Sequence, residues 1–443
     1  MKFEIPILFF VINSLAHAQQ ASTSKPIAIP ERPKCEIGER ERIQLRRAIQ
    51  VGDSLSRFQN AAQQTSIQKF GWPLKWIHQR PGNSFYSLSN YVDQDLSNGI
   101  RDFNCGSRTY NQHKGTDIYP WPGWWQMMDR EEVDIVAAAR GVIISKTDGN
   151  YDQNCTFAHQ AWNSVYLQHA EGLITWYGHM KKNTLTTKSI GDTVAEGEYL
   201  GKVGSSGIST GPHLHFEVYK TGVLQDPYTG GCNSSQTSLW KNQHPYYNQA
   251  LIRSFCCSGE PSFPPCPQRE NLKKDSIFSA TDTVFLSNYY RDLKSGDTTV
   301  LLLYNPLGQR IDSQFTIHDL SPDRFHDAGG WIWKKFLEPA AMSGNYRFES
   351  RYRGNTLSAE FVFEGISTAT KIRLQKHIIY QIGNEIEIHG LDQNKEIVIF
   401  DLYGRVQKNT TIWQDGILKF TLSGKGYYWI RSDKGFIVPI SNF

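Results

Sequence analysis

"GSSGISTGPHLHFEV" at residues 204–218 places two histidines one residue apart, directly after a run of glycine and serine. From Pro212 onward polar and apolar residues alternate strictly, which predicts a half-buried strand. Because successive side chains of a strand point to opposite faces, His213 and His215 are expected to share the polar face. Two neutral imidazoles side by side can divide the work of a metal site, one as a ligand and one as an acid or base. Taken alone, however, the pair is more typical of surface histidines.

The composition excludes several classes of protein. The chain has 443 residues, enough for two to four domains, and its 39% hydrophobic content supports folded cores. A mean hydropathy of −0.48 excludes a membrane protein with many spans. A net charge of +4 is small for this length and gives no indication of a nucleic-acid partner.

The first residues have the layout of a signal peptide. Lys2 precedes an apolar run at residues 5–12, and Ala16-His17-Ala18 supplies the small residues of a cleavage site. The apolar run is too short to span a bilayer stably. We therefore expect a signal peptide at residues 1–18, export, and no integral membrane segment after cleavage.

Export permits disulfides, and the chain has seven cysteines. An odd number leaves at least one without an intramolecular partner, and no pair has the CxxC spacing of a cysteine zinc site. The adjacent Cys256 and Cys257 cannot easily bond each other. We expect a disulfide between Cys105 and Cys155, which would link two loops near the histidines.

A second candidate for metal ligands precedes the histidine pair in the chain. A catalytic zinc site needs three protein ligands and one open position, and the sequence has no HExxH motif. "YNQHKGTDIYP" at residues 110–120 places His113 and Asp117 four residues apart. Gly115 and Pro120 argue against a helix there. Gly115 is expected to let the backbone turn so that both side chains aim at one point.

A third segment, "GLITWYGHMKK" at residues 172–182, also alternates with the period of a strand. Tyr177 and His179 are therefore expected to share a face. The preceding "NSVYLQHAEG" at residues 163–172 predicts another strand, in which His169 has apolar neighbours. We interpret His169 as a structural or supporting residue.

The order HxGxD, TxYxH and GxSTGPHLHFEV resembles the lysostaphin- and LytM-type zinc metallopeptidases, whose signature is HxxxD plus HxH on a small antiparallel sheet. The short strands and glycine turns of "VAAARGVIIS" (136–145) and "GDTVAEGEYLGKVG" (191–204) add to the resemblance, which covers roughly residues 102–222. It implies one zinc ion with the ligands His113, Asp117 and His215. It also implies that His179 and His213 are the non-ligand histidines of the catalytic centre.

The resemblance implies peptide-bond hydrolysis. His213 or His179 could accept the proton of the attacking water and pass it to the leaving amine. Tyr177 could bond the oxyanion or only pack, and packing is favoured; Glu217 shares the histidine face and need not be catalytic. The sequence predicts a secreted zinc endopeptidase acting on peptidoglycan stem peptides or cross-links. Two alternatives stay open: a zinc-free LytM-like module that regulates or binds wall hydrolases, and a peptidase acting on glycine-rich proteins.

The overall prediction is a mainly β protein with an antiparallel-sheet metallopeptidase domain at residues 81–250. Residues 19–80 are an N-terminal extension or pro-segment, with a surface helix around 38–50, that either blocks the substrate groove or packs against the domain. In the domain, Trp121, Trp124 and Trp125 either line a groove or bury a loop, and packing is favoured.

Beyond the metallopeptidase domain, "CCSGEPSFPPCP" (256–267) indicates a linker at residues 251–274, and alternating segments predict a β-sandwich at residues 275–370. Residues 376–443 form a small C-terminal β-domain. Its "FDLYGR" (400–405) and "GKGYY" (424–428) resemble the C-terminal sorting domains of Bacteroidota type IX secretion cargo. This resemblance implies secretion machinery as a partner, and passage through the periplasm to the cell surface or the medium.

Overall fold

The computed structural model describes residues 24–29, 31–38, 42–44, 46–50, 68–78, 84–157, 160–233, 237–321, 323, 325–337 and 341–365, together with the strands between 378 and 442. The chain divides into two compact units, residues 1–366 and 367–443. The expected signal peptide at residues 1–18 lies outside the described residues. No helix in the described part of the chain is long and apolar enough to cross a membrane.

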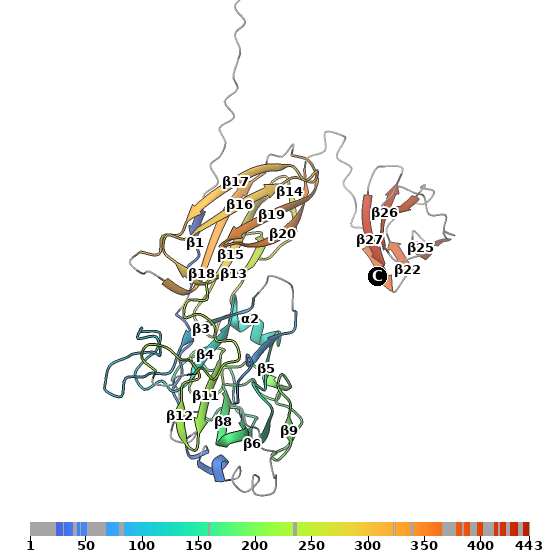
Figure 1. Ribbon diagram of the computed structural model, residues 1–443. Coiled ribbons are helices and arrows are strands. Elements are labelled where there is room, and N and C mark those ends of the chain that lie inside the picture. The colour runs from blue at the N-terminus through green and yellow to red at the C-terminus, as the bar shows by residue number, and fades with distance from the viewer. Residues whose placement is uncertain are drawn as a thin grey trace, which may run out of the picture. The chain divides into compact units, whose positions relative to one another are not determined.

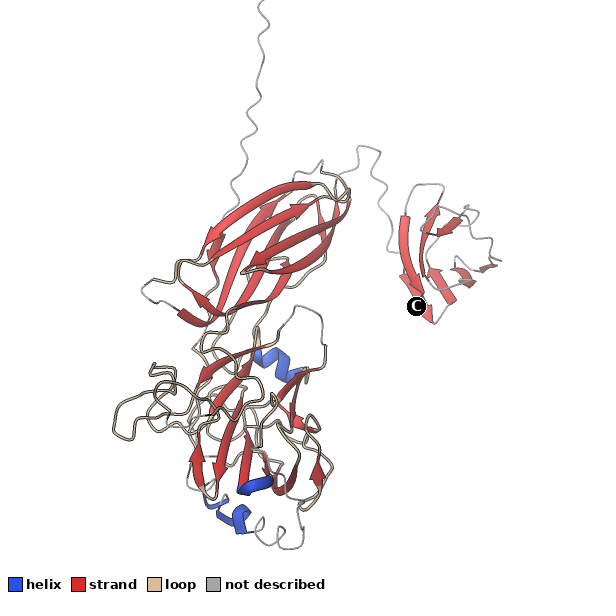
Figure 2. Ribbon diagram, in the orientation of Figure 1, coloured by secondary structure: helices blue, strands red, loops and turns tan. Residues whose placement is uncertain are grey.

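The prediction of a mainly β protein with several antiparallel sheets is confirmed (Figures 1 and 2). The metallopeptidase domain, so named after the sequence prediction, contains one large antiparallel sheet and one small one. The large sheet has the order β3 (Tyr86–Asn90), β4 (Thr116–Pro120), β11 (Leu214–Lys220), β8 (Leu173–Gly178), β7 (Ser164–Gln168), β6 (Gly141–Thr147) and β9 (Thr193–Val194), with β12 (Val223–Gln225) also beside β11. The small sheet consists of β10 (Tyr199–Lys202), β5 (Val133–Val136) and β2 (Leu74–Trp76).

The core of the metallopeptidase domain begins before residue 81. Phe70, Leu74 and Trp76 are buried in the same cluster as Val165 and Phe216 of the large sheet. Residues 70–76, which the sequence analysis assigned to the N-terminal extension, therefore belong to the domain: they supply strand β2 and side chains of its core. The boundary was misplaced because β2 has only three residues, too few to show a period.

Strand β11 is buried on both faces, and not on one as predicted. Phe216 and Val218 pack into the domain core. The face that carries His215 and Glu217 is also fully buried, because the N-terminal extension covers it. Residues 42–44 and 46–50 of this extension are helical, where the sequence predicts a surface helix.

Two sheets pack face to face as a β-sandwich. One has the order β1 (Ser24–Pro26), β18 (Phe325–Phe336), β15 (Thr283–Lys294) and β13 (Ala250–Cys257); the other has β14 (Ile277–Ser279), β20 (Asn355–Glu364), β19 (Gly344–Tyr352), β16 (Thr298–Tyr304) and β17 (Arg310–Ile317). All pairs are antiparallel except β14 with β20. Side chains from both sheets, such as Trp333 and Phe348, share one core. The predicted linker is wrong over its first residues, because β13 pairs with β15 there.

The tryptophan cluster joins the metallopeptidase domain to the sandwich. Trp121, Trp124 and Trp125, the last two on α2 (Trp124–Asp129), are buried in one cluster with Ile252 and Tyr289 of the sandwich. The indole Nε1 of Trp121 donates a hydrogen bond of 3.1 Å to a sandwich carbonyl. These side chains are buried and pack against the sandwich, as favoured by the sequence analysis.

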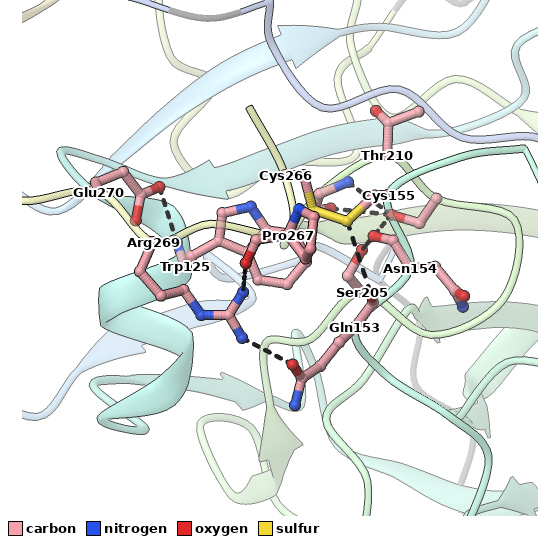
Figure 3. Close-up of a disulfide and its surroundings, with 12 residues drawn as sticks. Trp125, Gln153, Asn154, Cys155, Ser205, Thr210, Cys266, Pro267, Arg269 and Glu270 are labelled. Atoms are coloured by element: carbon pink, nitrogen blue, oxygen red, sulfur yellow. Dashed lines mark hydrogen bonds between the residues drawn. A yellow bond between two sulfur atoms is a disulfide. The ribbon is translucent and has the colours of Figure 1, made fainter. Parts of the chain in front are cut away.

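The disulfides differ from the expected Cys105–Cys155 pair. Cys105 bonds Cys232, and Cys155 bonds Cys266 (Figure 3). Cys266 lies in the proline-rich segment after β13, so the second disulfide ties that segment to the loop before β7. Sequence spacing alone could not show this proximity. Cys35, Cys256 and Cys257 are free.

The second unit contains two small antiparallel sheets. Their orders are β21 (Ile378–Ile382), β22 (Glu385–His389), β25 (Ile417–Thr421), β24 (Ile412–Gln414), and β23 (Ile397–Asp401), β26 (Gly426–Ser432), β27 (Ile437–Asn442). "FDLYGR" starts at the end of β23, and the two adjacent tyrosines of "GKGYY" lie in β26.

Candidate metal centre

Three adjacent strands bring the candidate residues to one place. His215 lies on β11 directly opposite Asp117 of β4 on one side and Gly178 of β8 on the other. His179 follows Gly178 directly, and His213 immediately precedes β11. Residues nearly 100 positions apart in the sequence thus meet because their strands are neighbours in the large sheet.

His113 approaches from the loop before β4. Its Nδ1 donates a hydrogen bond of 2.7 Å to the carbonyl of Tyr91, which fixes the ring and leaves Nε2 directed at the site. Nε2 is buried without a hydrogen-bond partner, although it lies 3.1 Å from Asp117 Oδ2. The two atoms face a shared point, as ligands of one cation would.

Gly115 makes room for His215 and does not turn the chain. A Cβ at residue 115 would lie 2.6 Å from Cε1 and Nε2 of His215. Its φ is not positive, so any residue could adopt its backbone conformation. The expectation that glycine was needed for a turn is therefore wrong; what it supplies is close approach of the imidazole.

The His215 ring is held between two carboxylates. Nε2 lies 2.9 Å from Glu217 Oε1 and Nδ1 lies 2.8 Å from Asp117 Oδ1. When Nε2–H donates to Glu217, the lone pair of Nδ1 faces a carboxylate oxygen of Asp117. Two electron-rich atoms at this distance repel each other unless a proton or a metal cation lies between them. Glu217 is in turn paired with Arg42 at 3.2 Å.

Asn90 is a residue of the site that the sequence reasoning missed. It ends β3 opposite Asp117, and its Nδ2 donates a hydrogen bond of 3.0 Å to Asp117 Oδ2. This bond orients the carboxylate. The only sequence signal was "YSLSN", a short stretch that could form a buried strand and that ends in an asparagine. Without knowing that this strand pairs with β4, Asn90 could not be assigned to the site.

His179 and His213 form a second pair beside the first. Their rings are 4.5 Å apart between centroids. The Nδ1 of His179 donates to the carbonyl of Ser206 at 2.6 Å, and that of His213 donates to the carbonyl of Gly211 at 2.8 Å. Both Nε2 atoms are buried and without a hydrogen-bond partner. They are therefore available to a group that enters the site.

Tyr177 does not share a face with His179, contrary to the prediction. β8 ends at Gly178, and His179 has a left-handed φ of 57°, which breaks the alternation. The Tyr177 ring packs against Phe216 in the core, and its hydroxyl accepts a hydrogen bond of 2.8 Å from the Ala138 amide. It packs and does not face the histidines.

His169 lies outside this group of residues. Its Nδ1 bonds the carbonyl of Arg140 at 2.9 Å and its Nε2 bonds Thr175 Oγ1 at 2.7 Å, so both ring nitrogens are used. Burial lowers the pKa of His169 to about 4. The residue is a neutral, buried, hydrogen-bonded part of the sheet.

Comparison with known proteins supports a peptidase. Residues 111–227 match Peptidase family M23. The peptidoglycan DD-endopeptidase ShyC of Vibrio cholerae is 28% identical over 174 residues, which are 38% of this chain and 38% of that protein. The DD-carboxypeptidase/endopeptidase Mpg of Neisseria meningitidis serogroup B is 34% identical over 120 residues, 27% of this chain and 23% of that protein.

A third relative, the glycyl-glycine endopeptidase ALE-1 of Staphylococcus capitis, is 28% identical over 141 residues, 30% of this chain and 38% of that protein. The chain thus spans at most 38% of the length of each of these relatives. The family match and the relatives support a peptidase, and the match includes His113, Asp117, His179, His213 and His215.

The charges of the site favour a cation beside Asp117. Burial works against the charged form of this carboxyl, but His113 and His215 outweigh it and hold its pKa well below the usual range. Burial also lowers the pKa of His113, yet Asp117 raises it to about 9. The pKa of His179 is lowered by burial and by its neighbour His213. The carboxylate therefore keeps its charge deep in the protein, where positive charge, on these imidazoles or on a bound cation, balances it.

Besides Asn90, the structure adds a second residue that sequence reasoning did not connect with the site. Cys35 is fully buried, and its Sγ lies 3.3 Å from His215 Nδ1 and 3.7 Å from Asp117 Oδ1. Sγ, one ring nitrogen each of His113 and His215 and one Asp117 carboxylate oxygen lie within 4.8 Å of one another. No sequence signal linked this cysteine, almost 80 residues before His113, to the motif.

Proposed function

We propose that this protein is a zinc endopeptidase that hydrolyses peptide bonds in peptidoglycan stem peptides or cross-links. The observation that carries the proposal is the convergence of His113 Nε2, Asp117 and His215 Nδ1 beside the unpartnered Nε2 atoms of His179 and His213. Three ligands for one metal ion, beside two imidazoles that can accept or donate a proton, suit a hydrolytic metal centre.

The ligand set fits one zinc ion. Two imidazoles and one carboxylate are common ligands of catalytic zinc, and they leave a fourth position open. Glu217 and the Tyr91 carbonyl fix the ligand rings by bonding their other nitrogens, as outer partners of metal-bound histidines do. When bound, zinc would supply a Lewis acid that polarises the scissile carbonyl and lowers the pKa of water.

His179 and His213 are the groups that would move protons. Their Nε2 atoms face the site, while their Nδ1 atoms are held by carbonyls. One can accept a proton from the attacking water at Nε2, and the other can hold a proton for the oxyanion or the leaving amine. This arrangement replaces the glutamate of helix-based metallopeptidases.

The relatives and the disulfides support the substrate and the compartment. By name, one of the three relatives is a peptidoglycan DD-endopeptidase, one is a DD-carboxypeptidase/endopeptidase and one is a glycyl-glycine endopeptidase. Two disulfides favour an oxidising compartment, and thus a protein that acts outside the cytoplasm, secreted or at the cell surface.

Metal analysis and digestion of purified sacculi test the proposal together. We expect one zinc per chain and release of muropeptides, whose mass spectra identify the bond cut. His215→Ala should lose both. Because the site is buried, digestion is run on the intact chain and after limited proteolysis of the N-terminal extension. A native protein without zinc would support the regulatory module instead, and cleavage of a glycine-rich protein but not of sacculi would support the third reading.

The role of the C-terminal unit is a separate part of this proposal. We propose that residues 376–443 direct the protein through the periplasm to secretion machinery, on the sequence resemblance of "FDLYGR" and "GKGYY" alone. Deleting these residues and fractionating the cells tests it. Protein stranded in the periplasm is the expected result, and unchanged secretion would contradict it.

A further inference from the structure

The metal centre is covered by a segment from the beginning of the chain. We call residues 31–38 the strap. Its Lys34 amide donates to Thr210 Oγ1 at 2.8 Å, the Thr210 amide donates to the Lys34 carbonyl at 2.9 Å, and the Glu36 amide donates to the Ile208 carbonyl at 3.2 Å. The strap thus pairs, like a short strand, with the loop "GSSGISTG" that leads to His213 and His215.

The same loop is held from its other side by the disulfide-linked segment. The backbone of Ser209 forms an isolated antiparallel β-bridge with Cys35 of the strap and another with Thr156, the neighbour of Cys155. Ser205 Oγ donates to the Asn154 carbonyl at 2.8 Å (Figure 3). The Cys155–Cys266 disulfide holds the segment on this side in place, whereas the strap is held against the loop by hydrogen bonds.

The strap is also held at both ends. On one side, Ile27 donates its amide to Gly330 at 2.9 Å, and β1 joins the sandwich sheet beside β18. On the other, Arg42 contacts Glu217 Oε2 at 3.2 Å and Tyr219 OH at 2.7 Å. The chain on the two sides of the strap is thus anchored on two domains, and the strap lies against a site whose metal-ligand and histidine side chains are all buried.

Between these anchors, the side chain that points into the site is Cys35. Sγ lies 3.3 Å from His215 Nδ1, 3.7 Å from Asp117 Oδ1 and 3.9 Å from Asp117 Oδ2. The Tyr110 hydroxyl fixes the cysteine through its carbonyl oxygen and lies 3.3 Å from Sγ. The thiol is therefore held among the atoms of His113, Asp117 and His215 that would bind the metal.

We propose that Cys35 is the fourth ligand of the metal and that the strap keeps the peptidase latent. This inference rests on the proposed zinc site. Cys35 would hold the metal as a thiolate, its proton released to solvent, and would replace the water that a catalytic zinc keeps as its non-protein ligand. The unpartnered Nε2 atoms of His113, His179 and His213 are the second, independent sign that a group is bound here. Activity then requires that the zinc–sulfur bond break and the strap leave.

X-ray absorption at the zinc edge of the full chain tests the ligation directly. We expect one sulfur at about 2.3 Å beside nitrogen and oxygen ligands. Cys35→Ser should lose the sulfur and keep the zinc. Cys256→Ser, which changes another free buried cysteine, is the matched control and should leave the spectrum unchanged. No sulfur in the wild-type spectrum, or sulfur that persists in Cys35→Ser, would overturn the inference.

Hydrolysis of sacculi by the same proteins tests latency. A closed state that leaves only about 0.1–10% of the protein open predicts a rise of roughly tenfold or more in Cys35→Ser and none in Cys256→Ser. Equal rates for Cys35→Ser and wild type would overturn latency through this thiol. If neither wild type nor the variants cut sacculi, even after proteolysis has removed the strap, the proposed peptidase function fails. The zinc–sulfur signal in the X-ray absorption spectrum still tests ligation by Cys35 independently of activity.

Discussion

His215 donates its Nε2–H to Glu217 Oε1 at 2.9 Å, from a position two residues earlier on the same face of β11. The bond fixes which nitrogen of the ring faces the metal site. We predict that Glu217→Ala lowers zinc affinity about 10- to 100-fold, because the ring loses both its orientation and the carboxylate that raises its basicity. Competition with a zinc chelator measures the change.

Glu217→Gln is the matched control for this prediction. Its amide oxygen can still accept from His215, so most of the orientation is kept and the loss of affinity should be smaller. Unfolding of the metal-free proteins separates this effect from the loss of the Arg42 partner. Equal affinities for Glu217→Ala and wild type would show that the contact does not position the ligand.

The second prediction concerns the division of work between the histidines. His113→Ala, Asp117→Ala and His215→Ala should lose the metal. His179→Ala and His213→Ala should keep it, with turnover lower by roughly 10²–10⁴-fold, as expected for loss of a general acid or base. Metal content and hydrolysis after removal of the strap are the measurements. His169→Gln, outside the site, is the control; metal loss in His213→Ala would refute the division.

The sequence was informative where function depends on local pattern. Alternation around His215 and the spacing of His113 and Asp117 predicted the residues that the structure brings together, since strand neighbours in the large sheet preserve these faces. The local pattern failed for Tyr177. Alternation placed Tyr177 and His179 on the same face, but the positive φ of His179 turns the backbone, so the two side chains point to different sides.

Contacts between distant segments could not be predicted in this way. Cys35 and Asn90 reach Asp117 through a strap and a strand whose positions depend on the whole fold. The pairing of Cys155 with Cys266 likewise depends on how the sandwich packs against the metallopeptidase domain. Short strands such as β1 and β2 have too few residues to show a period, so the domain boundary at residue 81 was misplaced and the pairing of β1 with the sandwich was not predicted.

The third prediction concerns the Cys155–Cys266 disulfide. The double change Cys155→Ser with Cys266→Ser should lower the free energy of unfolding by about 2–5 kcal/mol, because the bond closes a long loop. It should also weaken zinc binding, since the segment it fixes supports the loop of Ser205 and Ser209 before His213. Denaturant unfolding and zinc competition measure the two effects.

The other disulfide provides the comparison. Cys105 and Cys232 are 127 residues apart, against 111 for Cys155 and Cys266, so the two loop entropies are nearly equal. Replacing Cys105 and Cys232 by serine should cost similar stability and leave zinc affinity nearly unchanged. If both double variants weaken zinc binding equally, the Cys155 segment has no special part in holding the site.

The last prediction is a pH dependence that originates at His169. Burial holds its pKa at about 4 in the folded protein, below the usual value of 6.5. Between these two values the unfolded chain binds a proton that the folded protein does not, so the stability due to this residue is complete above pH 6.5 and falls as the pH drops toward 4. The full effect is on the order of 3 kcal/mol. In urea unfolding, the stability of wild type should fall more steeply than that of His169→Gln over this range, and parallel pH profiles would show that His169 does not stay neutral in the folded state.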